Sequence, residues 1–172
     1  MQSIVLGGGC FWCTEAVFLT LKGVLGVKSG YMGGSADTAN YSDVCTGDTG
    51  HIEVIHVEFD DALIGLSDLL DVFFVIHDPT TLNRQGNDIG TQYASVIFYA
   101  NDTQKQLAQN KINALIAQGI DVVTQLLPIQ PFYTAEDYHQ NFFANNPTQG
   151  YCNIAIPPKL EKLKTQFAHL LT

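Results

Sequence analysis

The sequence predicts a single α/β domain with a mixed β-sheet and a loop-rich C-terminal tail. Short runs rich in β-branched residues alternate with segments whose apolar residues recur every three or four positions. The chain has 172 residues, 46% hydrophobic and 15% charged, so it is long enough to fill one core. No repeat or low-complexity segment points to a second unit, and we expect one domain over residues 1–172.

The N-terminal elements are a strand, a glycine-rich turn and a helix. Residues 2–6 form an apolar run typical of a buried strand, and residues 14–21 have helical spacing. The segment 7–13 between them reads GGGCFWC. This turn places Cys10 at the start of the helix, where unpaired N–H groups and the macrodipole favour an anion and lower a thiol pKa by about one unit. The alternative is that Cys10 is a small buried hydrophobe.

Two strands and a long polar loop come next. The apolar run 24–32 ends at a glycine pair and predicts a strand, and the loop 35–50 holds Tyr41 and Cys45. Loops of this length inside compact domains commonly carry function. The run 52–59 follows, and its β-branched content predicts another strand.

Glu53 is the informative residue of that strand. With a period of two it shares a face with Ile55, Val57 and Phe59, so its carboxyl points toward the core. Desolvation there raises a carboxyl pKa and makes the group a proton donor. The alternative is exposure at a frayed strand end.

The second half of the chain continues the alternation. It contains a helix over 67–76, a long loop over 80–92, a strand over 94–99, a helix over 101–116, a strand over 122–127 and an amphipathic helix over 160–167. Ser67 and Asn101 can cap the two longer helices, while Pro79 and Pro128 end elements because proline cannot continue them. The loop 80–92 delivers Tyr93 to the head of a strand.

Charge and cysteine content exclude several classes of function. The net charge is −9 with only 8 Lys plus Arg, which argues against an electrostatic grip on nucleic acid or an anionic membrane. No apolar stretch is long enough for a membrane span and the start is unlike a signal peptide, so we expect a cytoplasmic protein. In such a compartment four cysteines are catalytic or buried rather than a disulfide scaffold.

The pair Cys10 and Cys13 leaves more than one chemistry open. A Cys-x-x-Cys at a helix start is typical of a thiol-disulfide oxidoreductase of the thioredoxin type, although Phe11 and Trp12 would crowd a protein-docking face. The sequence lacks a second such pair or paired histidines, so we expect no metal. It also lacks the last glycine of a dinucleotide fingerprint, and we expect no cofactor.

Another chemistry uses more of the unusual residues. A thiolate that attacks a sulfoxide sulfur needs proton donors beside the oxygen, and a protonated carboxyl with two phenols supplies them. Aromatic walls suit an S-methyl group. The residues that would form this site are Cys10, Phe11, Trp12, Tyr41, Glu53 and Tyr93.

Several motifs in fixed order give the chain a family resemblance. They are GCFW at 9–12, GYMGG at 30–34, TGDTGHIE at 46–53, HDPT at 77–80, NRQGNDIGTQY at 83–93 and EDYHQ at 136–140. Over nearly its whole length the chain resembles peptide methionine sulfoxide reductase A, the reductase of one sulfoxide epimer.

This resemblance implies a fold, a reaction and a set of roles. The fold is a two-layer sandwich with a ferredoxin-like arrangement, and the reaction reduces the S epimer of methionine sulfoxide, free or in proteins, with thioredoxin as reductant. Cys10 matches the nucleophile, and Phe11 and Trp12 match the methyl pocket. The groups that match those holding and protonating the oxygen are Tyr41, Glu53 and Tyr93, and Asp88 matches a residue on the substrate side. We expect a monomer.

The resemblance also implies a resolving cysteine that condenses with a Cys10 sulfenic acid. Cys152 matches a family position in a turn-rich, mobile stretch and is the preferred candidate. Cys13, one helical turn from Cys10, is the alternative, and Cys45 is expected to be structural. A disulfide oxidoreductase and a module that only binds oxidised methionine remain open as other classes.

Overall fold

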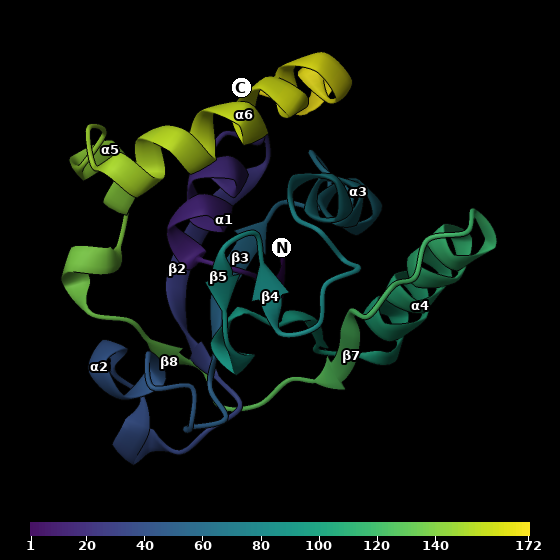
Figure 1. The fold of residues 1–172 in the computed structure, drawn as a ribbon. Helices are drawn as coiled ribbons and strands as arrows, with labels where there is room; N and C mark the ends of the chain where they lie inside the picture. Colours follow the sequence, from purple (N-terminus) through teal and green to yellow (C-terminus); the bar gives the residue numbers. More distant parts are fainter.

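A six-stranded mixed sheet is the centre of the computed structural model, which describes residues 1–172 (Figure 1). The strand order is β7-β6-β1-β3-β2-β8, and all neighbours are antiparallel except β6 and β7. The strands are β1 (Gln2–Gly8), β2 (Val24–Met32), β3 (Ile52–Phe59), β6 (Ser95–Tyr99), β7 (Gln125–Pro128) and β8 (Tyr133–Thr134). The α/β class with a mixed sheet is therefore confirmed.

The remaining elements are helices, short 3₁₀ turns and one small hairpin. The helices are α1 (Phe11–Phe18), α2 (Tyr41–Val44), α3 (Leu66–Ile76), α4 (Asp102–Ala117), α5 (Phe142–Asn145) and α6 (Gly150–Gln166). The 3₁₀ turns are η1 (Ala36–Thr38), η2 (Thr91–Tyr93), η3 (Asp137–His139) and η4 (Ala168–Leu170). The hairpin pairs β4 (Arg84–Gln85) with β5 (Asp88–Ile89).

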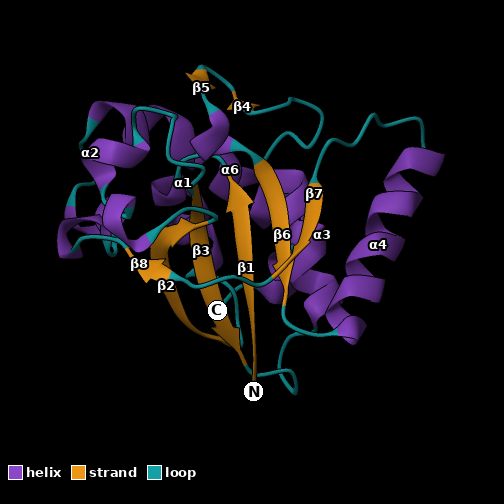
Figure 2. Ribbon diagram, turned by 90° about the horizontal axis from the view of Figure 1, so that it is seen from below, coloured by secondary structure: helices purple, strands orange, loops and turns teal.

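The main hydrophobic core lies between the sheet and the helices. A cluster of 23 buried residues joins one face of β1, β3 and β6 to α1 and α3. A smaller cluster of 7 on the opposite face is packed by Leu127 and Phe132. Figure 2 shows α1, α3 and α6 behind the sheet, while the segment from β7 to β8 crosses in front of it. That crossing puts β8 at the far edge from β7 and covers the second face.

The alternation predicted for β3 is confirmed. Glu53 is 2% exposed, and Ile55, Val57 and Phe59 on the same face are fully buried, whereas His56 and Glu58 are only half-buried. Because β3 pairs with β2 on both sides of Glu53, which lies opposite Tyr31, the carboxyl is held at the core face rather than at a frayed end.

The turn into α1 requires glycine. Gly9 has a φ of +92°, and a Cβ there would lie 2.7 Å from the Gln85 side chain on the β4–β5 hairpin. Cys10 is the N-cap of α1, and its carbonyl accepts the N–H of Cys13 at 3.1 Å. The positive φ and the close approach together fix Cys10 at the end of β1, at the mouth of the helix.

Several predicted boundaries are wrong. Gly65 rather than Ser67 is the N-cap of α3, and β7 begins at Gln125 because its parallel pairing starts opposite Val96. The last helix starts at Gly150, ten residues before the predicted start, so the tail has less loop than expected. The prediction rested on apolar spacing within residues 160–167, whereas α6 continues on the N-terminal side through Pro157 and Pro158.

The N-cap of α4 is confirmed. The Asn101 side chain accepts the N–H of Gln104 at 2.9 Å.

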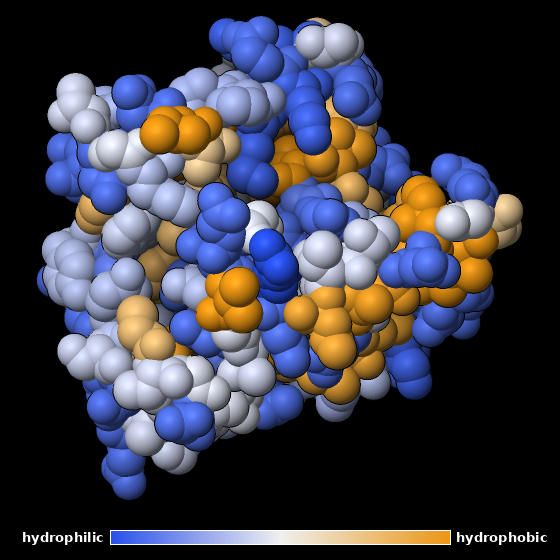
Figure 3. Space-filling model, in the orientation of Figure 1, coloured by the Kyte–Doolittle hydropathy of each residue, from blue (hydrophilic) through white to orange (hydrophobic).

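Figure 3 shows apolar side chains gathered on the side of the molecule that carries α4 and β7, where Ile116 and Ile129 are exposed. None of the helices combines the length and the apolar content needed to cross a lipid bilayer.

A buried carboxylate anchors the C-terminal tail to α1. Glu15 is 2% exposed and accepts the N–H groups of Asn141 at 2.9 Å and Phe142 at 3.2 Å. The side-chain amide of Gln140 adds a strand-like pair of hydrogen bonds to the backbone of Ser29, at 3.0 and 2.9 Å. These bonds hold the segment before α6 against β2 and α1.

We predict that Glu15→Ala lowers the free energy of unfolding by about 2–3 kcal/mol, because two partly buried N–H groups lose the buried carboxyl group that accepts their hydrogen bonds. Urea denaturation measures the change. Glu161→Ala is the control, since the Glu161 side chain is 71% exposed and pairs only with Lys164. A change for Glu15→Ala no larger than for the control would contradict the anchoring role.

Candidate active site

The predicted site residues converge at the N-terminal end of α1. Cys10 is half-exposed there, and the Glu53 carboxyl lies next to it, because the Phe11 N–H donates to Glu53 Oε1 at 3.2 Å. The pKa values of Tyr41 and Tyr93 are both raised, first by burial and then in part by the charges of Glu53 and Cys10. The N-cap of α1, the first residue of α2, strand β3 and the end of η2 therefore each contribute one residue to a shared electrostatic environment.

Glu53 has the properties of a proton donor at neutral pH. Burial raises its pKa from 4.5 to about 8, with smaller contributions from the charges of Asp88 and Cys13, while the Phe11 N–H acts in the opposite direction. The group is thus mostly uncharged at pH 7. The expectation of a desolvated carboxyl facing the core is confirmed.

The acidity expected for the Cys10 thiol is wrong. Its pKa is raised well above the ordinary value, first by the hydrogen bond with Cys13, then by burial and by the charge of Glu53. The N–H of Trp12 at the helix start does lower the pKa, but it is outweighed. The same hydrogen bond lowers the pKa of Cys13, helped by the positive charge of Lys159. In the resting pair, Cys13 is the more acidic thiol.

Trp12 is fixed by two contacts. Its ring stacks on Phe142, with centroids 3.9 Å apart and planes 6° apart, and its Nε1–H donates to His139 Nδ1 at 2.9 Å. Phe11 is fully buried, 5.0 Å from the His139 ring between centroids. Of the two aromatic residues, only Trp12 is partly open to solvent.

Glu136 ties the Tyr41 loop to the rest of the site. One carboxylate oxygen accepts the Tyr31 hydroxyl at 2.8 Å, and the other accepts the Tyr41 N–H at 2.9 Å. The Cys45 thiol on the same loop is exposed. The sequence gives no direct signal for the Glu136 contacts, since they join positions 95 and more residues apart.

A hollow of about 470 Å³ opens on the other side of Cys10, between the β4–β5 hairpin and α6. Asp88 lies near it and accepts the hydroxyl of Tyr151, the second residue of α6. The residues that line the hollow include Cys10, Cys13, Gln85, Tyr151 and Lys159. Sequence reasoning missed Tyr151 and Lys159, whose place depends on how α6 packs on α1.

Cys152 is not in a turn-rich segment as expected. It lies in the first turn of α6, is 0% exposed, and its N–H donates to Gln149 Oε1 at 2.8 Å. It forms a small buried cluster with Cys13 and Ile156, and Cys10 packs against that cluster. Three of the four cysteines are therefore close together, and all four are free thiols.

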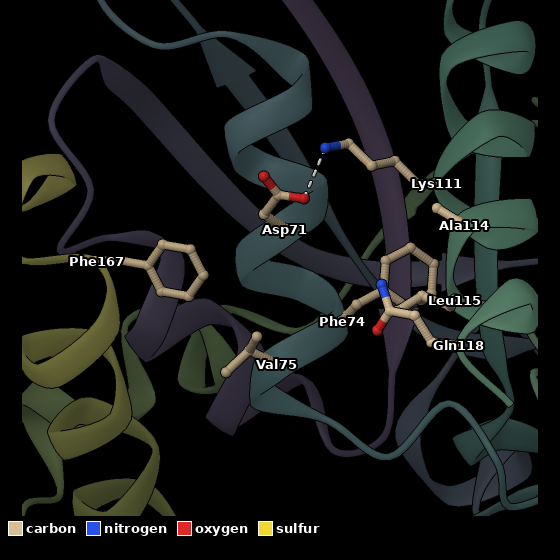
Figure 4. A pocket seen from close by; sticks show the side chains of 8 residues that line it. All are labelled: Asp71, Phe74, Val75, Lys111, Ala114, Leu115, Gln118 and Phe167. Atoms are coloured by element: carbon tan, nitrogen blue, oxygen red, sulfur yellow. Dashed lines mark hydrogen bonds and ion pairs between the residues drawn. The ribbon is translucent and has the colours of Figure 1, made fainter. Parts of the chain in front are cut away.

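A second hollow, of about 410 Å³, is unrelated to these thiols. It lies between α3, α4 and Phe167, and Figure 4 shows Phe74 and Leu115 beside an ion pair of Asp71 with Lys111 at 2.7 Å. No group of three or more His, Cys, Asp or Glu side chains is placed to hold a metal ion.

A half-exposed thiol, a second thiol in contact with it and an uncharged carboxyl suit redox chemistry at sulfur. By class the molecule is an α/β thiol oxidoreductase. Among the known families, the model described as "Peptide methionine sulfoxide reductase" matches residues 2–171. The chain therefore belongs to the peptide methionine sulfoxide reductase family, and its activity is the reduction of methionine sulfoxide.

Individual relatives agree with this assignment. The peptide methionine sulfoxide reductase MsrA of Psychrobacter cryohalolentis is 60% identical over 171 residues, 99% of each chain. Reduced Mxr1 of Saccharomyces cerevisiae is 38% identical with a TM-score of 0.82, covering 91% of this chain and 89% of that one. Mxr1 in complex with Trx2 is also similar, with 29% identity and a TM-score of 0.57 over 82% and 84% of the two chains.

The raised pKa of Glu53 makes stability depend on pH. The folded-state pKa of about 8 exceeds the ordinary 4.5, so between these pH values the folded state binds more protons than the unfolded state. The stability contributed by the protonated carboxyl is therefore fully present below pH 4.5 and is lost as the pH rises through about 8. We predict that the free energy of unfolding of Glu53→Gln falls by about 2–4 kcal/mol less than that of the parent between pH 5 and pH 9, because the amide does not ionise.

Urea unfolding of parent and Glu53→Gln between pH 5 and pH 9 measures the effect. The difference in unfolding free energy should move in favour of the variant as pH rises. Glu58→Gln, on the same strand but half-buried on the other face, is the control and should follow the parent. Parallel pH curves for Glu53→Gln and the parent would mean that Glu53 ionises normally.

Proposed function

We propose that the protein reduces the S epimer of methionine sulfoxide, free and protein-bound, through a sulfenic acid on Cys10 and an intramolecular disulfide that thioredoxin reduces. The observation that carries the proposal is the uncharged Glu53 carboxyl beside the amide that follows Cys10. A carboxylic acid in that place can give a proton to a sulfoxide oxygen while the thiol sulfur attacks.

In the first half of the reaction the oxygen moves between two sulfurs. The Cys10 sulfur attacks the sulfoxide sulfur, Glu53 protonates the oxygen, and the oxygen then leaves on Cys10 as a sulfenic acid while methionine is released. The resting thiol has a raised pKa, partly through the charge of Glu53. Keeping Glu53 protonated removes that repulsion, so one protonation state of the carboxyl serves both the nucleophile and the acid.

The substrate contacts follow from the groups around Cys10. Tyr41 and Tyr93 keep their protons because burial and nearby negative charge raise their pKa values, so both hydroxyls can donate to the oxygen. Trp12 offers an aromatic wall held by Phe142 and His139, against which an S-methyl group packs, and Phe11 lies beneath it. Asp88 holds Tyr151 at the rim on the substrate side.

In the second half a cysteine thiol replaces the hydroxyl of the sulfenic acid. Cys13 and Cys152 are the two candidates, because both lie in the sulfur cluster beside Cys10. The solved complex of Mxr1 with Trx2 supports thioredoxin as the reductant.

We also propose that residues 1–172 act as one domain and as a cytoplasmic monomer, without nucleic acid or membrane as partner. The net charge of −9 supports the exclusion of polyanions. A two-layer, ferredoxin-like arrangement is supported by the inner strand order β6-β1-β3-β2 with α1 and α3 on one face.

We predict that Cys10→Ser abolishes reduction, since the oxygen then has no acceptor sulfur. Each epimer of methionine sulfoxide is incubated with enzyme and dithiothreitol, and methionine is quantified. Methionine should form from the S epimer only. Cys45→Ser, at an exposed thiol outside the sulfur cluster, is the matched control and should keep at least half the parent rate. Release of methionine by Cys10→Ser would disprove the proposed nucleophile, and reduction of insulin disulfides alone would favour a disulfide oxidoreductase.

Glu53 is tested by the rate of the first turnover. Glu53→Ala should slow it by about 10²-fold or more, as expected for a lost general acid. Glu53→Gln should slow it less, because its amide still donates a hydrogen bond to the oxygen. The parent rate should fall above pH 8, where the carboxyl ionises, and the variants should lack this fall. Equal losses in the two variants would argue against proton or hydrogen-bond donation.

A further inference from the structure

Cys10 also lines a hollow that contains Lys159, a residue that the proposed reductive step does not use. The hollow between the β4–β5 hairpin and α6 is lined by Cys10, Cys13, Tyr151 and Lys159, whereas Glu53 and Tyr41 lie outside its lining. Cys13 is 4% exposed at this wall and belongs to the buried cluster against which Cys10 packs. The hollow is therefore on the side of the second thiol.

Lys159 is the cation of this hollow. It lies two turns after Tyr151 on α6, so the two side chains share a face of the helix. Its Nζ donates to the carbonyl of Ile76 at the end of α3, and it takes part in none of the three ion pairs of the structure. A half-buried ammonium group without a carboxylate partner is costly unless a negative charge forms nearby.

We propose that Lys159 is a positioning residue for resolution: its ammonium group stabilises the Cys13 sulfur as the nucleophile that closes a Cys10–Cys13 disulfide. The inference rests on the proposed function, because it needs a sulfenic acid on Cys10. The lowered pKa of Cys13, caused first by the Cys10 hydrogen bond and in part by Lys159 and Tyr151, agrees with it.

Position favours Cys13 over Cys152 for this step. Cys13 lies one turn along α1, where its N–H donates to the Cys10 carbonyl at 3.1 Å and its side chain belongs to the cluster against which Cys10 packs. Cys152 is 0% exposed and its pKa is raised to about 11 by burial and by the charge of Cys13, so it is rarely a thiolate. Cys10 is half-buried and lines the hollow, so a Cys10–Cys13 disulfide would face a space open to an external dithiol.

The step is balanced without an external oxidant. The Cys13 thiolate attacks the Cys10 sulfur, an S–S bond forms and the S–O bond breaks. The hydroxide leaves as water, with one proton replacing the proton that Cys13 gave up. The Cys13 sulfur is oxidised and the Cys10 sulfur is reduced.

Other titrating groups also face this pair. Besides Cys10 and Lys159, they are Glu53 on β3, Asp88 on β5, Tyr151, Cys152 and Lys162 on α6, and His77 after α3. Lys159 is the cation among the causes that lower the pKa of Cys13, and Asp88 acts against it.

The experiment follows one turnover without reductant. Reduced enzyme is mixed with methionine sulfoxide, methionine is counted, the Cys10 sulfenic acid is trapped with dimedone at timed intervals, and the disulfide is mapped by mass spectrometry. In Lys159→Met, disulfide closure at pH 7 should slow about tenfold, the effect of a one-unit rise in thiol pKa, and the deficit should shrink as pH rises. The first methionine should form at the parent rate.

Two further variants separate charge from structure. Lys159→Arg should restore closure because it keeps the positive charge, and Lys164→Met, on an exposed part of α6, should match the parent. The inference is overturned if Lys159→Met closes the disulfide as fast as the parent at pH 7, if Lys159→Arg is as slow as Lys159→Met, or if the mapped bond joins Cys10 to Cys152. Absence of the methionine burst in the parent would instead refute the proposed function.

Discussion

The burial of one carboxyl is the constraint on which the site depends. Glu53 sits on the core face of a central strand, and its one hydrogen bond in the structure comes from the backbone N–H of Phe11, directly after Cys10. A single neutral amide does not offset the desolvation of a carboxylate, so the carboxyl keeps its proton near neutrality. The same contact sets the start of α1 against β3, and so the fold that places the thiol also places its acid.

The start of helix α1 has only a small effect on the pKa of the Cys10 thiol. An N-terminal turn lowers the pKa of a thiol, but at Cys10 this effect is smaller than those of a second thiol, burial and a neighbouring carboxyl. The resting site is thus a closely packed pair of thiols, with the Glu53 carboxyl next to the amide that follows Cys10 and with Lys159 in the same hollow as Cys13. In the proposed reaction this arrangement separates the two halves in space, because Glu53 would protonate the oxygen and Lys159 would stabilise the ionised second thiol.

Much of this could be predicted from the sequence because the deciding patterns are local. The period of two in residues 52–59 identified the inward face of Glu53, and the capping of α4 by Asn101 depends on a partner three residues away. The rest depends on contacts between distant elements. Apolar spacing gave only the second half of α6, so the burial of Cys152 and the approach of Lys159 to α1 were missed. The relative acidity of the two thiols also depends on distant groups, since burial and the charges of Glu53 and Lys159 add to the effect of each thiol on the other.

The central claim is that Glu53 is a neutral acid when the enzyme works. It is tested most directly by labelling glutamate side-chain carboxyls with ¹³C, assigning the Glu53 resonance by its absence in Glu53→Gln, and following its chemical shift with pH. The account predicts a midpoint near 8, so that the carboxyl is mostly protonated at pH 7. A midpoint at the ordinary value for a solvated glutamate, about 4.3, would contradict it.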